Sequence, residues 1–306
     1  MQVFCLDIGG TETRGALFAE DGALKARARG AGGALSLGAA QAEQAIRAVW
    51  EAICAELALG PDAAGKTRLC AGIAGHSLTE REDALAASLD DFESCQFVGD
   101  GYTALLAATA GQPGALISVG TGVTAQRLLP GGQTLALSGW GFPAGDLGGG
   151  AWLGLKLTGL LTKHLDGVPL DPPLPRTLCN DVMVIAGNTT KEIQAWQSTA
   201  RPAQYGALAR PIVAHAAADD PFCRGLLQMA AGEIIDLAEA LYKDKPGIVV
   251  LAGGLGAVLM PLCKAAAPGF DWQINTADPL VGAFLLASGQ APDEKLIMRP
   301  GFAASD

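Results

Sequence analysis

The sequence predicts an α/β protein made of two related halves. Short buried strands alternate with amphipathic helices along the chain, which is the pattern of α/β folds. A strand, a glycine-rich turn, a second strand, a hairpin turn and a third strand occur near the N-terminus and again after residue 114. Apolar residues make up 50% of the 306 residues and charged residues only 17%, so the chain can bury a large core and global disorder is excluded.

The first half is predicted to begin with three strands. Apolar residues at 3–6 and 15–18 flank a glycine turn at 8–11, and the hairpin dipeptide Asp21-Gly22 leads to a third strand at 24–28. A loop of small residues at 30–38 precedes a stretch of helical periodicity from 40 to 59. The further predicted elements are a strand at 67–73, a helix at 84–89, a strand at 96–98 and a helix at 101–110.

The second half begins after Gly111-Gln112-Pro113-Gly114, which breaks the helical pattern. We therefore predict an N-terminal domain of residues 1–112 and a C-terminal domain of residues 113–306, whose final helix packs back on the first domain. Strands are predicted at 115–119, 125–129, 134–137 and 248–251. Helices are predicted at 150–166, 189–197, 204–218, 223–243 and 279–288.

Charge and cysteine usage exclude several classes of function. There are 21 basic and 31 acidic residues, a net charge of −10, so nucleic acid and anionic membranes are poor partners. The seven cysteines are scattered without a CxxC pair, which argues against a disulfide framework, structural zinc and an iron–sulfur cluster. The N-terminal residues do not resemble a signal peptide, and no apolar run approaches the roughly 20 residues of a membrane span. We expect a cytoplasmic protein.

The first turn has the residues of a phosphate loop. Asp7 ends a buried strand, where an unpaired carboxylate is costly unless it has a task. Gly9 and Gly10 allow backbone N–H groups to approach an anion, and Thr11 and Thr13 add hydroxyl donors. Magnesium held by Asp7 through water could bridge that anion to the protein. The alternative is an ordinary Asx turn in a hairpin.

Two later turns repeat this chemistry. Gly120-Thr121-Gly122 again joins two strands, and the pair of turns could hold a polyphosphate from opposite sides. Gly253-Gly254 follows a buried strand and opens a helix, which suits an adenosine or an anion at a helix N-terminus. The dinucleotide fingerprint GxGxxG and the P-loop pattern are both absent from the sequence.

Two further aspartates have a functional and a structural interpretation. Asp100 follows a strand and begins a helix, so it could cap that helix or serve as the base that accepts a hydroxyl proton during phosphoryl transfer. Asp146 could likewise be a helix N-cap. It also lies in a glycine-rich run with Trp140 and Gly141, and carboxylates with aromatic rings are typical of sugar sites.

Five motifs in order make the chain similar to a known family. DIGGTET, FVGDGYTALLAA, GALISVGTGVTAQ, SGWGFPAGDLGGGAWLG and VVLAGGLG resemble the N-acetylglucosamine and glucosamine kinases of the BadF/BadG-type branch of the actin-like ATPase superfamily. The resemblance spans nearly the whole chain. It implies two ribonuclease-H-like domains with an ATP and sugar cleft between them, and transfer of phosphate from ATP to the sugar 6-hydroxyl.

The resemblance also assigns roles to residues. Asp7 would position Mg²⁺, and Asp100 would be the general base. The phosphate and adenosine contacts would come from Gly9, Gly10, Thr11, Gly120, Thr121, Gly122, Gly253 and Gly254. Trp140, Gly141 and Asp146, together with Asp100, would contact the sugar. We therefore expect an amino sugar and ATP as partners. A homodimer is compatible with the sequence, which does not fix the oligomeric state.

The chain departs from the family pattern near the sugar. Where many relatives read GDEGSG, it carries Leu147 in place of the glutamate and Gly149 in place of the serine. The loop at 31–36 lacks the asparagine that relatives use to contact sugar. The alternatives are therefore a non-catalytic sensor of nucleotide or amino sugar, and an ATPase activator of the BadF/BadG type. The scattered cysteines count against the activator, and retention of both Asp7 and Asp100 favours catalysis.

Overall fold

The computed structural model describes residues 2–76, 79–243, 245–295 and 297–298. They form two compact units. The first unit contains residues up to Gly114, the segment 127–135 and the described residues from Thr276 onward; the second contains 115–126 and 136–275. The α/β fold predicted from the sequence is confirmed.

The first unit is built on a five-stranded sheet with the order β3-β2-β1-β4-β5. Its strands are β1 (Gln2–Ile8), β2 (Glu12–Ala19), β3 (Leu24–Ala31), β4 (Thr67–Ile73) and β5 (Ser94–Gly99). The first three strands are antiparallel neighbours, whereas β1 pairs with β4 and β4 with β5 in parallel. The carboxyl ends of β1, β4 and β5 therefore meet at one edge of the sheet, which is where ligands bind in α/β proteins.

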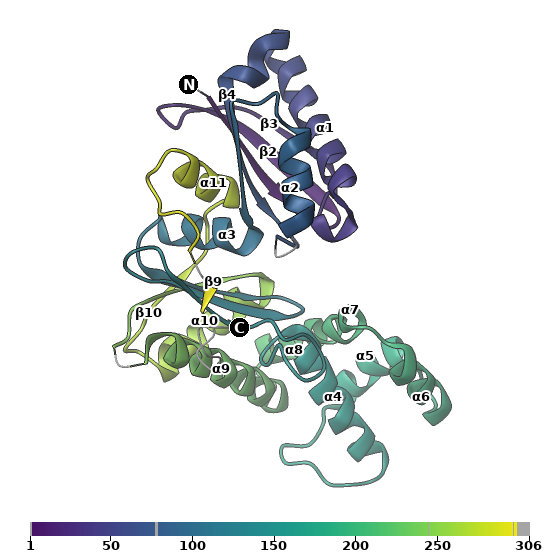
Figure 1. Ribbon diagram of the computed structural model, residues 1–306. Coiled ribbons are helices and arrows are strands. Elements are labelled where there is room, and N and C mark those ends of the chain that lie inside the picture. Colours follow the sequence, from purple (N-terminus) through teal and green to yellow (C-terminus); the bar gives the residue numbers. More distant parts are fainter. Residues whose placement is uncertain (1, 77–78, 244, 296, 299–306) are drawn as a thin grey trace. The chain divides into compact units, whose positions relative to one another are not determined.

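Helices cover both faces of this sheet, as Figure 1 shows. One face carries α1 (Ala39–Leu57) and α2 (Thr79–Ser88), and the other carries α3 (Asp100–Thr109) and α11 (Pro279–Ala287). Short 3₁₀ turns lie at η1 (Leu35–Leu37) and η2 (Pro61–Lys66). Phe4 is fully buried against Trp50 of α1, with ring centroids 5.1 Å apart, because every second residue of β1 faces that helix.

The final helix packs in the first unit, as expected from the sequence, and Arg127–Leu135 belongs to that unit as well, so the second unit is not the continuous range 113–306. α11 packs on α3, β1 and β4. Gly282 lets the two helices approach closely, because a side chain there would overlap the carbonyl of Thr103 in α3. An apolar helix buries its surface against the nearest uncovered sheet face, whichever part of the chain supplies that face.

The second sheet repeats the strand order of the first. Its order is β10-β9-β6-β7-β8-β11, in which β8, β7, β6, β9 and β10 take the places of β3, β2, β1, β4 and β5. The strands are β6 (Gly114–Val119), β7 (Val123–Leu128), β8 (Thr134–Ser138), β9 (Ile248–Ala252), β10 (Asp271–Ile274) and the two-residue β11 (Ile297–Met298). The duplication that the sequence pattern suggests is thus visible in the topology.

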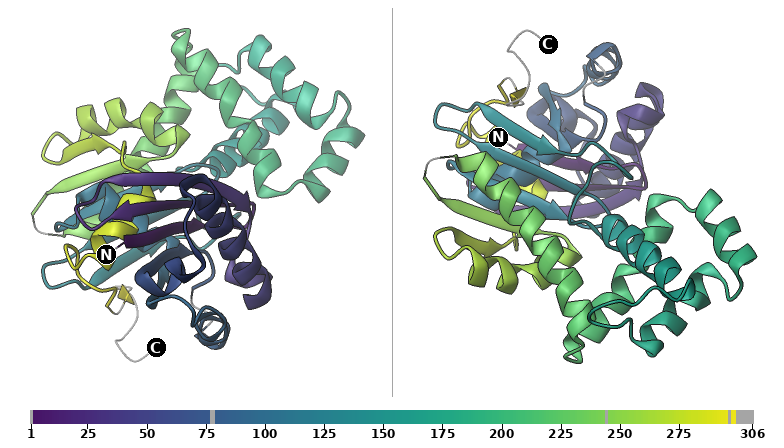
Figure 2. Two further views of the ribbon diagram at one scale, coloured as in Figure 1. Left: turned by 90° about the horizontal axis from the view of Figure 1, so that it is seen from above. Right: turned by 90° about the horizontal axis from the view of Figure 1, so that it is seen from below.

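Most of the helices described in the second unit lie between β8 and β9, and one follows β9. They are α4 (Gly150–Leu165), α5 (Arg176–Ala186), α6 (Thr190–Thr199), α7 (Pro202–Ala207), α8 (Ala209–Ala217), α9 (Pro221–Tyr242) and α10 (Gly254–Ala266). α9 and α10 pack on each other and lie on one face of the sheet, as the two views of Figure 2 show. α4 packs against α7, and α8 against α9 and α5.

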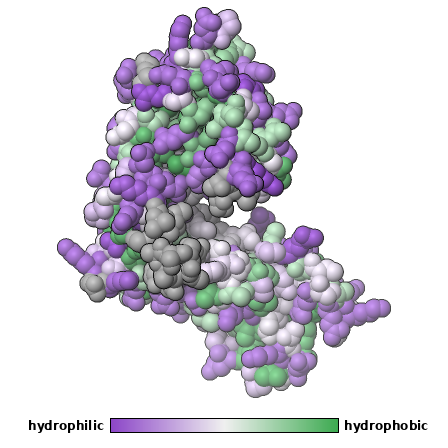
Figure 3. Space-filling view, viewed as in Figure 1, coloured by the Kyte–Doolittle hydropathy of each residue, from purple (hydrophilic) through white to green (hydrophobic). Residues whose placement is uncertain are grey.

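Figure 3 shows hydrophobic residues interspersed irregularly among hydrophilic ones on the face of each unit that it presents. Among the described residues, no helix combines the length and the apolar character that crossing a bilayer requires.

Candidate functional site

The turn between β1 and β2 has the accessibility that a phosphate loop needs. Gly10 and Thr11 are exposed, and the N–H of Gly9 donates to the carbonyl of Glu12 at 2.9 Å. The loop that precedes α1 supports this turn from behind. The N–H of Gly33 donates to the carbonyl of Gly9 at 3.1 Å, and a side chain on Gly32 would overlap the carbonyl of Gly10.

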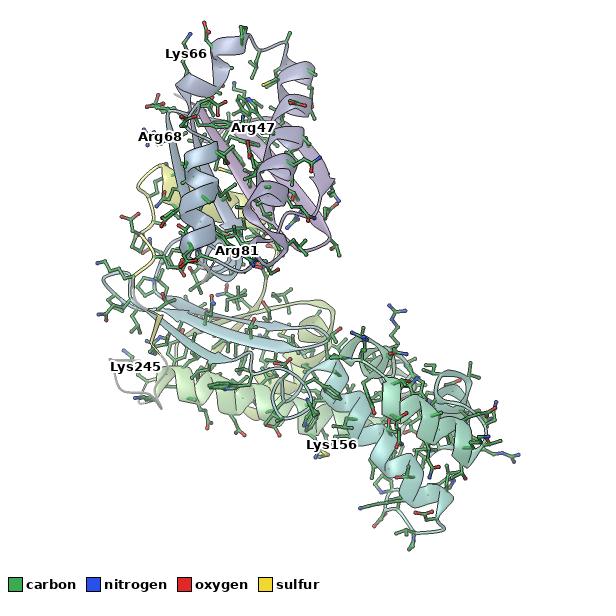
Figure 4. All side chains as sticks on the ribbon, turned by 45° about the vertical axis from the view of Figure 1, so that its right-hand side comes forward. Arg47, Lys66, Arg68, Arg81, Lys156 and Lys245 are labelled. Carbon is green, nitrogen blue, oxygen red and sulfur yellow. The ribbon has the colours of Figure 1, made fainter. Side chains whose placement is uncertain are left out.

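The supporting loop is itself fixed by a helix on the same face. Arg81 of α2, labelled in Figure 4, donates from Nη1 to the carbonyls of Leu35 and Ser36 at 2.7 and 2.9 Å. Gln41 of α1 donates to the carbonyl of Gly32 at 3.1 Å. Gly32 and Gly33 thus allow the backbone of this loop to pack closely against the turn between β1 and β2.

Thr13 differs from its predicted role. It lies within β2, is fully buried, and its hydroxyl has no hydrogen-bond partner among the described residues. Alternation along the strand turns its side chain to the opposite face from that of Arg14. Thr11 is exposed in the turn, whereas Thr13 does not present its hydroxyl to a ligand at the surface.

Asp7 lies opposite Arg14 in the β1–β2 ladder and forms an ion pair with it. Two guanidinium nitrogens, Nε and Nη2, donate to the same oxygen, Oδ2, the former at 3.2 Å. This hydrogen bond is the main reason that the pKa of Arg14 is raised. Arg14 also faces Asp278 at 3.9 Å, and that carboxylate pairs with Arg27 at 2.9 Å.

A magnesium ion fits this arrangement when most of its ligands come from elsewhere. Asp7 supplies a hard carboxylate at the end of a strand, which is the donor that Mg²⁺ prefers. Among the described residues, no group of three or more acidic, histidine or cysteine side chains could hold a metal. Asp7, which also pairs with Arg14, is a side chain whose chemistry fits contact with a magnesium ion.

Asp100 is the first residue of α3 and not its N-cap. The N-cap is Gly99, and the Oδ1 of Asp100 accepts a hydrogen bond from the N–H of Gly101 at 2.9 Å. The pKa of Asp100 is raised above its ordinary value of 3.8, first because the surrounding protein displaces water and also because Asp7 is negative; the Gly101 bond opposes this shift. A carboxylate with a raised pKa at a strand end is suited to accept a proton.

In the second unit, the turn Gly120-Thr121-Gly122 is hydrogen-bonded to the start of α4. The N–H groups of Gly150 and Ala151 donate to the carbonyls of Gly120 and Thr121 at 2.8 and 2.9 Å. Gly120 and Thr121 remain exposed. A cavity of about 740 Å³ opens beside this turn. Its volume falls within the range of roughly 300–1,000 Å³ that small-molecule sites occupy.

The walls of this cavity are mainly small and apolar, contributed by α7, α8 and α10. The lining residues are Gly120, Thr121, Gly150, Ala203, Gly206, Ala207, Ala209, Arg210, Val213, Ala214, Gly254, Leu255 and Val258. Gly253 is the N-cap of α10 with φ +81°, and a side chain there would overlap the carbonyl of Val119. The predicted turn Gly253-Gly254 thus borders the same cavity as Gly120 and Thr121.

The run around Trp140 forms a tight loop in the second unit. Trp140 is 65% exposed, and the N–H of Gly145 donates to the carbonyl of Gly141 at 2.7 Å. Asp146 has φ +57° and is not the N-cap of α4, which is Gly149. Its carboxylate lies directly over Gly122, because a side chain on Gly122 would come within 3.0 Å of the Asp146 Cγ atom. The structure therefore brings Asp146 to the turn Gly120-Thr121-Gly122.

Comparison with known proteins identifies the family of this chain. Residues 6–287 match the BadF/BadG/BcrA/BcrD ATPase family. The chain belongs to this family. The family predicted from the five motifs is therefore confirmed.

Relatives named as amino-sugar kinases cover nearly the whole chain. Glucosamine kinase GspK of Vibrio cholerae serotype O1 is 29% identical over 286 residues, which are 92% of this chain and 94% of that protein. A crystal structure described as a candidate N-acetylglucosamine kinase from Chromobacterium violaceum has a TM-score of 0.77 and 33% identity, covering 93% of this chain and 98% of that one. The ROK hexokinase of Thermus thermophilus, with a TM-score of 0.54 and 19% identity over 93% of this chain and 98% of its own, shares the fold.

Sequence reasoning missed two residues that the structure places at these sites. Arg210 is the charged residue in the lining of the 740 Å³ cavity. A single arginine in the run of small residues from 206 to 216 was the available indication. Glu294 reaches the start of α3 from a distant part of the chain, where its Oε2 accepts a hydrogen bond from the N–H of Gly99 at 3.1 Å. No local pattern predicts that contact.

Proposed function

We propose that this protein is a sugar kinase that transfers the γ-phosphoryl group of ATP to the 6-hydroxyl of an amino sugar, N-acetylglucosamine or glucosamine. The observation that supports this proposal most directly is the pair of glycine–threonine turns, each at the end of the first strand of a duplicated sheet. An apolar cavity lies beside the second of these turns. The amino-sugar kinase relatives support this choice of acceptor. The reaction would take place in the cytoplasm, where ATP is supplied.

The second unit would bind the nucleotide. The cavity between α7, α8 and α10 offers apolar walls for an adenine ring, and Arg210 offers a positive charge for a phosphate. The exposed turn at Gly120 and Thr121 would contact phosphate oxygens, with the N–H of Thr121 as donor, because the N–H of Gly120 already donates to the carbonyl of Gly122 at 3.0 Å. In the first unit, the exposed turn at Gly10 and Thr11 is proposed to offer N–H donors of the same kind, whereas the N–H of Gly9 donates to the carbonyl of Glu12 at 2.9 Å.

In the proposed mechanism, the oxygen of the sugar 6-hydroxyl bonds to the γ-phosphorus of ATP. Asp100 accepts the proton of that hydroxyl. The bond from that phosphorus to the β,γ-bridging oxygen breaks, and ADP leaves with the electron pair. Magnesium, when bound, would neutralise charge on the phosphates, with Asp7 holding it through water. The proton on Asp100 then returns to solvent, and the enzyme is restored.

Trp140, Gly141 and Asp146 are proposed to contact the sugar. An exposed indole ring can cover the apolar face of a pyranose, and a carboxylate can accept hydrogen bonds from sugar hydroxyls. Leu147 is 40% exposed in this loop, where many relatives have a glutamate. A leucine side chain can neither donate nor accept a hydrogen bond, so this position is proposed to bear on which amino sugar is preferred.

A coupled assay of ADP release tests the proposal. Purified protein with Mg²⁺ and ATP is offered glucose, glucosamine, N-acetylglucosamine or N-acetylmannosamine, and a sample without sugar gives the background rate. We expect one of the two glucosamine sugars to raise ADP release well above that background. If no sugar raised the rate while ATP still bound, the kinase proposal would fail and the sensor hypothesis would replace it.

A further inference from the structure

The segment that follows α11 crosses the part of the first unit where Asp100 lies. We name residues 290–295 the C-terminal strap. The phenol of Tyr102 donates to the carbonyl of Pro292 at 2.8 Å, and Gln96 donates from Nε2 to Oδ1 of Asp293 at 3.0 Å. Lys295 donates from Nζ to the carbonyl of Gly131 at 2.7 Å. The strap is thus held at β5, at α3 and at the turn between β7 and β8.

Glu294 is the strap residue that reaches the start of α3. Its side chain is only 12% exposed, and its Oε2 accepts the N–H of Gly99 at 3.1 Å. Gly99 is the N-cap of α3 and immediately precedes Asp100. The backbone that carries the proposed base is therefore fixed by a carboxylate from a segment almost 200 residues further along the chain.

This contact replaces one that the helix cannot make for itself. In a capping box, a glutamate or glutamine at the third helical position reaches back to the N–H of the N-cap residue. In α3 the third position is Tyr102, whose phenol donates to the strap, and the N-cap Gly99 has no side chain. Glu294 supplies the missing acceptor. The strap therefore supplies, from a distant part of the chain, the acceptor that a capping box supplies from within the helix.

A histidine lies near Glu294. His76, in the turn after β4, lies with Nε2 at 3.7 Å from Oε2 of Glu294 and with Nδ1 at 2.9 Å from Oε2 of Glu82. The imidazole therefore lies between a carboxylate of α2 and the carboxylate of the strap. The hydrogen bond that fixes Glu294 is the one from the N–H of Gly99.

We propose that Glu294 is a positioning residue for the base Asp100, and that the C-terminal strap is part of the catalytic apparatus of this chain. The inference rests on the proposed function only for the role of Asp100, because the contact between Glu294 and Gly99 stands without it. A shift of about 1 Å in a reacting group can lower a rate by roughly 100-fold. The position of the first residue of α3 consequently matters more to turnover than to substrate binding.

Three variants test the proposal. Glu294→Ala removes the acceptor, Glu294→Gln retains an acceptor oxygen without the charge, and Asp293→Ala is the matched control. The control removes a neighbouring carboxylate and its bond to Gln96 but leaves the hydrogen bond between Glu294 and the N–H of Gly99 in place. Each variant is measured by amide hydrogen exchange over residues 97–104 and by steady-state kinetics with the best sugar.

For Glu294→Ala we expect faster exchange over residues 97–104 and a fall of roughly 10- to 100-fold in kcat, with KM values within about twofold of wild type. Glu294→Gln should recover most of both properties, and Asp293→Ala should change neither. Unchanged exchange and unchanged kcat in Glu294→Ala would overturn the proposal, as would an equal loss in Asp293→Ala.

The exchange measurement separates this proposal from the proposed function. If the wild-type protein phosphorylated no sugar, the proposed function would fail by itself. Wild-type exchange in Glu294→Ala would then also overturn the positioning role, whereas faster exchange confined to residues 97–104 would support it.

Discussion

Substitution of Gly253 by alanine should destabilise the second unit, whereas the same change at the next residue should not. Gly253 has φ +81° and ψ 162°, a region essentially restricted to glycine that costs a residue with a side chain about 1–3 kcal/mol. The new Cβ would also lie 2.8 Å from the carbonyl carbon of Val119 and would overlap its oxygen. Because that atom belongs to the central strand β6, relief requires a backbone shift, and overpacking of this kind costs about 1–3 kcal/mol more.

Gly254 provides the matched control. It is the first residue of α10, and no atom lies within 4 Å of the position that a Cβ would occupy there. Replacement of glycine by alanine within a helix stabilises by up to about 1 kcal/mol. The added methyl group would stand at the wall of the 740 Å³ cavity that is proposed to bind the nucleotide, so the KM for ATP should rise while the fold is retained.

Thermal unfolding followed by circular dichroism measures both effects. A change of 1 kcal/mol moves the melting temperature of a domain of this size by roughly 2–4 °C, so Gly253→Ala should lose at least about 4 °C. Gly254→Ala should melt at or slightly above the wild-type temperature but gain less from added Mg-ATP. A Gly253→Ala variant that melts within about 1 °C of wild type would refute this reasoning, as would equal losses in both variants.

Three further outcomes are expected. Asp100→Asn should raise the melting temperature at neutral pH, because the raised pKa of Asp100 means that its charged form is disfavoured in the folded state. This gain should disappear as the pH falls through the folded pKa and below the ordinary value of 3.8, where the carboxyl is protonated in both states. Arg210→Gln should raise the KM for ATP several-fold with little change in kcat, since it removes the charge beside the cavity; an unchanged KM would exclude Arg210 from nucleotide binding. Gly122→Ala should displace Asp146 and lower kcat/KM for the sugar, whereas Gly159→Ala, at an exposed position of α4 where an added methyl group meets no atom within 4 Å, should leave sugar kinetics nearly unchanged.

Local patterns were sufficient for most of the fold. The hairpin dipeptide Asp21-Gly22 and the repeated glycine turns predicted the strands of both halves, because such turns depend on the residues within them. The helix predicted at 204–218 is divided into α7 and α8 at Leu208, which periodicity alone does not reveal. The helix α5 was missed, because the prolines before it made the segment resemble a loop.

The candidate site was predictable only where it is local. The turns at Gly9-Gly10-Thr11 and Gly120-Thr121-Gly122 follow strands in the sequence and occupy exposed turns in the structure. Contacts made by packing were not predictable. The carboxylate of Asp146 over Gly122 and the bond from Gly99 to Glu294 depend on how distant segments meet. The burial of Thr13 depends on the register of β2 and also could not be foreseen.

The most direct test of the proposed mechanism is the turnover of Asp100→Ala with the best sugar, measured beside its affinity for ATP. Removal of a general base lowers a rate by roughly 100- to 10,000-fold. The affinity for ATP should be retained, since the cavity is lined by residues of the second unit and Asp100 belongs to the first. We predict a fall in kcat of at least about 100-fold with ATP binding close to wild type. Turnover near the wild-type rate would contradict the assignment of Asp100 as the base, and with it the proposed mechanism.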